Sequence, residues 1–353
     1  MYTKIKYSVS DMVRWTQNET YKFIILALIP VILYEIFNLK WLHLPWLPIA
    51  LVGTAVAFVI GFQNSAAYDR IWEARKIWGG IVNVSRSWGI MVNDFITNDF
   101  TEEKATEDEF KKIKKELIFR HIGWITTLRY AMRAQKQWEQ FLNYKTNRQW
   151  SERANIHEFK YSLEDTLKPY VSTEEYDYLM SKTNKSTHSI SLQSKQLKAL
   201  KTRGLIEDFR HMEMENLLVE MLSLQGKSER IKNFPYPRQF ATLNHYFVWI
   251  FLVLLPFGVM HEFDLIGISI IENNPFVGKF FVWFSIPFSV IVSWVFHTME
   301  RIGKTGDNPF EGTSNDVPIT TMSRGIEIDL REMLDEPSES IPKPIEELYN
   351  IQM

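Results

Sequence analysis

The segment from Trp41 to Tyr68 contains no Asp, Glu, Lys or Arg in 28 consecutive residues. About 20 apolar residues are enough to cross the hydrocarbon core of a bilayer, so this segment can span a membrane. A charged and aromatic run, Asp69–Lys76, follows it directly. This junction predicts a membrane-spanning helix that continues into a helix outside the bilayer, and it limits the chain to membrane-protein folds.

Three further apolar segments accompany this one. The first runs from Phe23 to about Leu39 and carries Pro30 and Glu35, whereas Gln239–His261 and Phe280–Met299 are free of charge. We therefore predict four membrane-spanning helices.

The distribution of Lys and Arg predicts the orientation of these helices. Lys40 lies between the first two segments and Lys279 between the last two, whereas the other flanks are richer in basic residues. Those flanking residues are Lys4, Lys6, Arg14, Lys22, Arg70, Arg75, Lys76, Lys232, Arg238, Arg301 and Lys304. Since basic residues collect on the cytoplasmic side, we expect a multi-pass protein of the plasma (inner) membrane with both termini in the cytoplasm.

The residues between the second and third apolar segments are polar and show helical periodicity. Asp108–Gln137 and Met212–Leu224 are predicted to be helical, and Ser172 is predicted to cap another helix. We expect an all-α membrane protein without strands. Its predicted parts are residues 1–62 (N-terminal segment and first two spans), 63–238 (cytoplasmic helical region), 239–300 (last two spans) and 301–353 (cytoplasmic loop, helix and tail).

Composition argues against several function classes. A net charge of -2 is unlike that of a nucleic-acid-binding protein, and the absence of cysteine excludes thiolate chemistry. The eight histidines are scattered and none forms an i, i+4 metal pair; His121 is expected to be a structural group within a helix. We predict no catalytic residues, no cofactor and no metal site.

One loop is rich in oxygen ligands. Residues 306–316 include Asp307, Asn308, Glu311 and Asp316, and such loops can bind calcium. Pro309 breaks the EF-hand pattern, and the simpler interpretation is a loop whose side chains hydrogen-bond to its own backbone and cap the helix that follows.

The second apolar segment carries two parallel stripes. Gly53, Ala57 and Gly61 recur every four residues and would let neighbouring helices approach closely. Offset by one position are Thr54, Phe58 and Phe62. In a monomer Phe58 and Phe62 would face the core or lipid, whereas in a symmetric oligomer they would form apolar rings that can gate ions by dewetting. The polar run Gln63–Ser65 that follows fits a pore that widens.

The chain resembles the bestrophin family in its prokaryotic branch. Gly61–Trp88 resembles the family signature, and Phe119–Arg129, Ser228–Pro237 and Asn308–Leu330 are similar to later family segments in the same order. The resemblance implies a homopentameric channel with four spans per subunit, in which one pore crosses the membrane and then a cytoplasmic helical vestibule.

The resemblance also implies site residues. The pore neck corresponds to Thr54, Phe58 and Phe62, with Thr54 in place of a bulkier aliphatic residue. The cytoplasmic aperture is assigned to Ile206, with Leu205 or Phe209 as alternatives. Animal relatives are gated by calcium at the loop after the fourth span. This chain keeps Asn308 and Asp316 but has Thr313-Ser314-Asn315 where acidic residues are usual, so the loop is interpreted as a vestigial calcium clasp.

The leading functional hypothesis is a homopentameric channel for monovalent ions. We expect a preference for cations because of the prokaryotic branch, and an anion (chloride) channel is the alternative. A lipid-modifying membrane enzyme built on Asp69, Arg70 and Glu73, or a non-conducting scaffold, is more remote, because ion pairing explains those three residues more simply.

Overall fold

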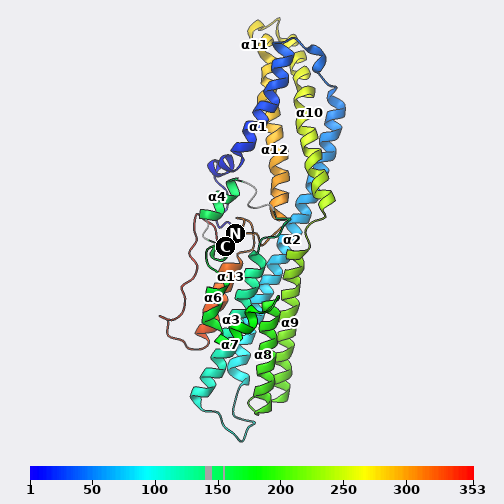
Figure 1. The fold of residues 1–353 in the computed structure, drawn as a ribbon. Helices are drawn as coiled ribbons and strands as arrows, with labels where there is room; N and C mark the ends of the chain where they lie inside the picture. The colour runs from blue at the N-terminus through cyan, green and yellow to red at the C-terminus, as the bar shows by residue number, and fades with distance from the viewer. Residues whose placement is uncertain (140–144, 154–155) are drawn as a thin grey trace. The chain divides into compact units, whose positions relative to one another are not determined.

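The computed structural model describes residues 1–139, 145–153 and 156–353 (Figure 1). These residues form helices and no strand, apart from isolated bridges of Ile351 with Tyr2 and Leu348. The all-α prediction is confirmed. Two compact units are present: a span unit of residues 4–69 and 235–307, and a polar unit of residues 1–3, 70–234 and 308–353.

The span unit is built from long helices. They are α1 (Val9–Glu35), α2 (Trp46–Phe95, of which residues 46–69 belong here), α10 (Arg238–Ile270) and α12 (Ser285–Gly306), with the short helices η1 (Lys40–Leu42), α11 (Pro275–Phe280) and η4 (Phe281–Phe284) between them. Helix α12 packs against both α1 and α10. Buried Phe23, Val56, Leu252 and Val259 join α1, α2 and α10 in one apolar core.

Among the described residues, three helical segments are long and apolar enough to cross a membrane. They are Lys40–Phe95, Arg238–Ile270 and Pro275–Gly306. They contain the predicted second, third and fourth spans. The predicted first span falls in α1, which ends at Glu35 and does not meet the same criterion of length and composition, so the count of four spans stays a prediction.

Helix α2 is continuous for 50 residues. At about 1.5 Å per residue its length is ~75 Å, more than twice the thickness of a bilayer core. The predicted continuation of an apolar span into a charged helix is therefore confirmed as one unbroken element.

The polar unit contains the remaining helices. They are the rest of α2, α3 (Glu107–Arg133), α4 (Lys145–Arg153), α5 (His157–Lys160), α6 (Leu163–Leu167), η3 (Lys168–Tyr170), α7 (Thr173–Met180), α8 (Lys185–Thr202), α9 (Asp208–Asn233) and α13 (Ile319–Glu332). Ser172 accepts a hydrogen bond from the backbone of Glu175 and caps α7, as predicted. Helix α3 lies centrally and packs against α8 and α13.

Aromatic side chains fill the core of the polar unit. Trp78 and Trp88 on α2 and Trp124 on α3 are completely buried. His121 lies against the rings of Trp88 and Trp124, and its Nε2 is 2.9 Å from Ser85 Oγ. Burial lowers the pKa of His121 to about 3, so the ring is neutral and structural, as the sequence predicted.

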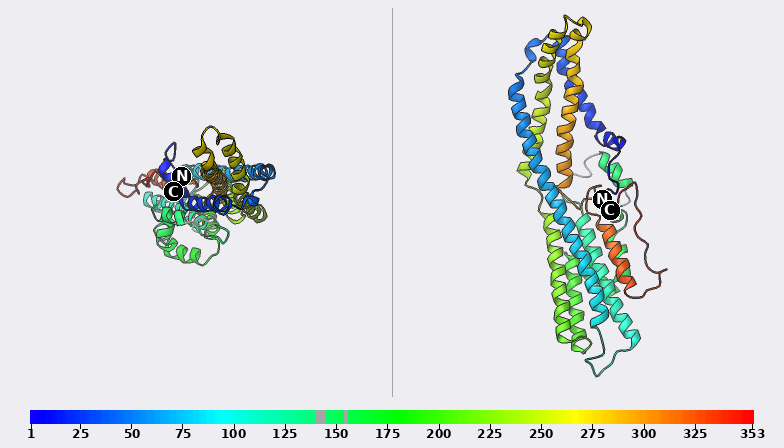
Figure 2. Two further views of the ribbon diagram at one scale, coloured as in Figure 1. Left: turned by 90° about the horizontal axis from the view of Figure 1, so that it is seen from above. Right: turned by 180° about the vertical axis from the view of Figure 1, so that it is seen from behind.

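The two ends of the chain lie side by side in the polar unit (Figures 1 and 2). Gln352 donates its backbone N–H to Met1 at 2.9 Å, and Thr3 donates to Asn350 at the same distance. Thr321 on α13 also donates its hydroxyl to the main-chain oxygen of Met353, which ties the C-terminal tail to the core.

Candidate pore-lining surface

The predicted neck residues form an exposed stripe along α2. Phe58 is 66% exposed and Phe62 is 73% exposed, and Thr54 lies on the surface one turn earlier. The Thr54 hydroxyl donates to the main-chain oxygen of Ala50 at 2.9 Å. The hydroxyl hydrogen is therefore used within the helix, which makes this position less polar than the sequence suggests.

An open groove of about 920 Å³ runs beside this stripe in the span unit. Its walls come from α2, α10 and α12 and are almost entirely apolar. They are Trp46, Ala50, Gly53, Thr54, Ala57, Phe58, Gly61, Phe62, Ser65, Phe251, Leu255, Phe288, Val292 and Phe296. The neck stripe thus borders a surface that a further apolar helix could fill.

The small residues of α2 fall into two groups. Gly53 is buried, and a Cβ on it would lie 2.6 Å from Cε2 of Phe251 on α10. Ala57 and Gly61 are exposed, and a Cβ on Gly61 would meet nothing within 4 Å. Gly53 therefore serves packing within the chain, whereas the other two leave room next to the groove.

The polar residues after the stripe do not all face outward. Gln63 is 1% exposed and accepts a hydrogen bond from Asn244 on α10 at 3.1 Å. Asn64 Oδ1 lies 2.7 Å from the position that a Cβ on Gly303 would take. Only Ser65 of the three is exposed and lines the groove. Gln63 and Asn64 therefore join α2 to α10 and α12.

Of the residues predicted for a cytoplasmic aperture, Leu205 and Ile206 lie between α8 and α9, and Phe209 lies at the start of α9. Ile206 is 2% exposed and Leu205 is completely buried, and both belong to the core of the polar unit. Phe209, in the first turn of α9, is 72% exposed. Since a side chain that lines an opening must reach the surface of its subunit, this geometry favours Phe209 over Ile206.

Phe209 begins an exposed face of α9. Residues spaced by three or four positions continue it along the helix. They are Glu213, Asn216, Glu220, Ser223 and Lys227, all exposed. The sequence carries no signal for this face, because most of its residues are polar and they show no recognisable spacing of metal or catalytic groups.

Asp69, Arg70 and Glu73, the residues considered for a lipid-modifying enzyme, are either bonded within the polar unit or exposed to solvent. Arg70 donates to the main-chain oxygens of Ile231 and Phe234, at 2.9 and 3.0 Å, and so caps the C-terminal end of α9. Glu73 pairs with Arg230, and Asp69 is exposed. Ion pairing and helix capping account for Arg70 and Glu73.

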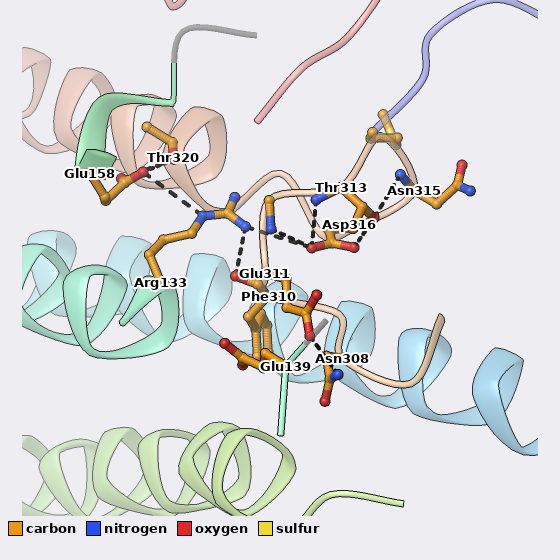
Figure 3. A network of polar contacts seen from close by, with 12 residues as sticks. Arg133, Glu139, Glu158, Asn308, Phe310, Glu311, Thr313, Asn315, Asp316 and Thr320 are labelled. Carbon is orange, nitrogen blue, oxygen red and sulfur yellow. Dashed lines mark hydrogen bonds and ion pairs between the residues drawn. The ribbon is translucent and has the colours of Figure 1, made fainter. Parts of the chain in front are cut away.

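Asp316 is the central hydrogen-bond acceptor of the oxygen-rich loop after α12 (Figure 3). Its carboxylate accepts hydrogen bonds from the backbone of Gly312 at 2.6 Å and of Thr313 at 3.0 Å, and from the Thr313 hydroxyl. Asn308 donates to Glu311 at 2.6 Å. The loop is therefore closed by its own side chains, as the simpler interpretation predicted. The predicted cap on the next helix is wrong, because α13 begins after Pro318, which offers no side-chain hydrogen bond to the helix start.

Arg133 at the end of α3 meets this loop (Figure 3). Its Nη1 donates to the main-chain oxygen of Phe310 at 2.9 Å and lies 3.8 Å from Asp316. Its Nε lies 3.9 Å from Glu158 on α5. Glu158 also accepts from Thr320 on α13 at 2.9 Å and pairs with Arg129 at 2.8 Å. No pattern in the sequence predicts a contact between Arg133 and Glu158, because they lie on different helices and meet only when the chain folds.

Several acidic side chains are buried close together beside this loop. Burial next to Asp316 and Glu139 raises the pKa of Glu311 to about 8. Lys232 pairs with Glu139, and burial lowers the pKa of this lysine. Within the described residues no group of three or more His, Cys, Asp or Glu side chains is placed to hold a metal ion.

Comparison with known proteins identifies the family of this chain. The sequence model described as "Bacterial/Fungal Bestrophin protein" matches residues 9–273 and 274–332. The chain belongs to the bestrophin family. The resemblance predicted from the sequence, including its bacterial branch, is confirmed.

Curated relatives of this bestrophin match most of the chain at low identity. The voltage-dependent anion channel-forming protein YneE of Salmonella typhi is 23% identical over 321 residues, which cover 90% of this chain and 87% of that protein. YneE of Escherichia coli K12 is 24% identical, with coverages of 85% and 82%. The voltage-dependent anion channel-forming protein RSc3414 of Ralstonia nicotianae is 25% identical, with coverages of 84% and 82%.

A solved structure shares the fold. The bacterial bestrophin homolog from Klebsiella pneumoniae superimposes with a TM-score of 0.68 at 19% identity, covering 90% of this chain and 98% of the other. The helical architecture of this bestrophin is thus that of an experimentally solved family member.

Proposed function

We propose that this bestrophin is the subunit of a homopentameric ion channel of the plasma membrane. The observation that carries the proposal is the exposed stripe of Thr54, Phe58 and Phe62 on α2, which borders an apolar groove. The names of its curated relatives, which are channel-forming proteins, support the same class. In the assembled pentamer the stripe would form the neck of a single central pore. Both termini of each subunit would lie in the cytoplasm.

The groove and the open small residues support assembly around α2. A second copy of this helix could lie against Phe288, Val292 and Phe296, since Ala57 and Gly61 present no side chain bulk there. Phe58 and Phe62 from each copy would then form apolar rings, which impede ions because a narrow apolar passage loses its water.

The cytoplasmic aperture is proposed at Phe209 in place of Ile206. Phe209 is exposed at the start of α9, whereas the Ile206 side chain is buried in the core of its own subunit. A ring of Phe209 side chains would make a second apolar constriction.

The preference for cations rests on the exposed face of α9. This face carries two carboxylates, Glu213 and Glu220, and one ammonium group, Lys227, before it ends at Arg230, whose charge is paired with Glu73. If Phe209 lines the aperture, this face lines the vestibule and concentrates cations. The alternative is an anion channel, which the names of the curated relatives favour.

Two measurements test this proposal. The mass of the purified protein in detergent should equal five chains. In bilayers with a salt gradient, the reversal potential should lie on the cation side, and Glu213→Gln with Glu220→Gln should move it toward zero. Lys227→Gln is the matched control and should move it the other way. A wild-type reversal potential near that of chloride would establish the anion alternative.

A further inference from the structure

The loop of residues 306–316 has the oxygen-rich composition of a cation site, yet a cation of the protein itself already lies beside it. We propose that the guanidinium of Arg133 takes the place of a bound divalent cation, so that the loop is closed by the chain itself and takes up no calcium.

Arg133 bridges three groups by one hydrogen bond and two longer ion pairs. Its Nη1 donates to the main-chain oxygen of Phe310 at 2.9 Å, and the guanidinium lies 3.8 Å from Asp316 of the loop and 3.9 Å from Glu158 of α5 (Figure 3). Among the described residues, its Nε and Nη2 have no hydrogen-bond partner, so charge more than hydrogen bonding holds it there. Because Glu158 also accepts from Thr320, the set joins α3, the loop, α5 and α13. The side chain of Arg133 is 1% exposed, so solvent screens these interactions little.

The loop oxygens are also engaged. Calcium requires six to eight oxygen ligands in one shell. Both carboxylate oxygens of Asp316 accept hydrogen bonds, from Gly312 and from Thr313. Asn308 directs its amide group toward Glu311. A metal ion would have to break these bonds before it gained ligands.

The charges of the cluster are nearly balanced without a metal. Arg129, Arg133 and Lys232 face the carboxylates of Glu139, Glu158, Glu311 and Asp316. Burial raises the pKa of Glu311 to about 8, so this group is mostly protonated at neutral pH, and burial raises the pKa of Asp316 as well. The three cations therefore face at most three full negative charges. A divalent ion would leave an uncompensated excess of positive charge in a buried place.

Space is not the obstacle. A hollow of about 350 Å³ lies against Arg133 and is also lined by Glu139, Glu158 and Glu311. Removal of the guanidinium would therefore leave carboxylates next to a volume that a hydrated ion can reach. This contrast makes the role of Arg133 testable by substitution.

The experiment measures calcium binding and thermal unfolding of the purified full-length protein, with no dependence on ionic current. Wild type should bind well below one radioactive calcium ion per chain, and its Tm should be the same in EGTA and in millimolar CaCl2. Arg133→Met should lower Tm in EGTA, and calcium should restore several degrees of that loss.

Two control variants sharpen the result. Arg129→Met also removes a cation from Glu158 but none from the loop, so its Tm should not respond to calcium. Arg133→Lys keeps the charge and should stay insensitive to calcium. Should Arg133→Met fail to fold in EGTA, recovery of folded protein in calcium but not in magnesium would support the proposal.

Two outcomes would overturn the proposal. One is stoichiometric calcium binding by the wild-type protein. The other is an Arg133→Met variant whose stability, or whose failure to fold, is unaffected by calcium.

Discussion

Gly53 on α2 lies directly against the ring of Phe251 on α10, so closely that a Cβ on Gly53 would come within 2.6 Å of the ring atom Cε2. Phe251 is itself 3% exposed, which leaves its ring little room to move. This contact places the Gly53 side of α2 against α10, whereas Phe58 and Phe62 lie on the part of the helix that remains exposed.

The first prediction concerns this contact. Gly53→Ala should lower the free energy of unfolding by about 1–3 kcal/mol, as overpacking of a filled core does. Gly61→Ala is the matched control, because its Cβ meets open space and alanine favours the helix. Chemical denaturation of both variants in detergent measures the difference. Equal stabilities would contradict the packing described here.

The second prediction separates Ile206 from Phe209. Ile206→Ala empties a buried site and should cost about 2–4 kcal/mol of stability. Phe209→Ala should change the stability of the subunit by less than about 0.5 kcal/mol, since the ring is exposed, yet it should raise the conductance if Phe209 lines the aperture. Denaturation and single-channel recording of the two variants measure both effects. A higher conductance in Ile206→Ala alone would return the aperture to Ile206.

The third prediction concerns pH. The pKa of His121 is lowered to about 3 in the folded protein, from 6.5 in the unfolded chain. Between these values the unfolded chain binds one more proton, so stability falls as pH decreases, by about 1.4 kcal/mol per unit from this group. His121→Gln should make the stability less dependent on pH between 5 and 6.5 by roughly that amount.

His188→Gln is the control for this pH series, because His188 is only half-buried and bonds to Tyr178 at the surface of the polar unit. Denaturation curves at several pH values compare the three proteins. A His121→Gln protein with the same pH dependence as wild type would show that the buried ring is not the source.

Sequence patterns predicted the features that depend on neighbouring residues. The charge-free run before Asp69 predicted α2, and Ser172 predicted a helix start, because hydropathy and capping act locally. Asn184 caps α8, and Lys185–His188 form its first turn, although polar residues of this kind are typical of a loop; packing against α3 outweighs that weak local preference.

In the candidate site, too, local patterns predicted some features, whereas others depend on how distant segments pack. Periodicity placed Thr54, Phe58 and Phe62 on one face of a helix, and that face is exposed. No local pattern could distinguish Ile206 from Phe209, since burial there depends on how α8 and α9 pack. Arg133, Glu158 and Asp316 meet only in the folded chain, so their cluster was invisible to sequence analysis.

Ionic current through bilayers that contain only this purified protein tests the central proposal most directly. Wild type should conduct, and Phe58→Ala with Phe62→Ala should conduct more, because the apolar neck becomes wider and wetter. Phe240→Ala with Phe247→Ala removes two exposed rings of α10 outside the groove and should leave the current unchanged. Folded, inserted protein that gives no current above the lipid baseline, in wild type and neck variant alike, would contradict the account.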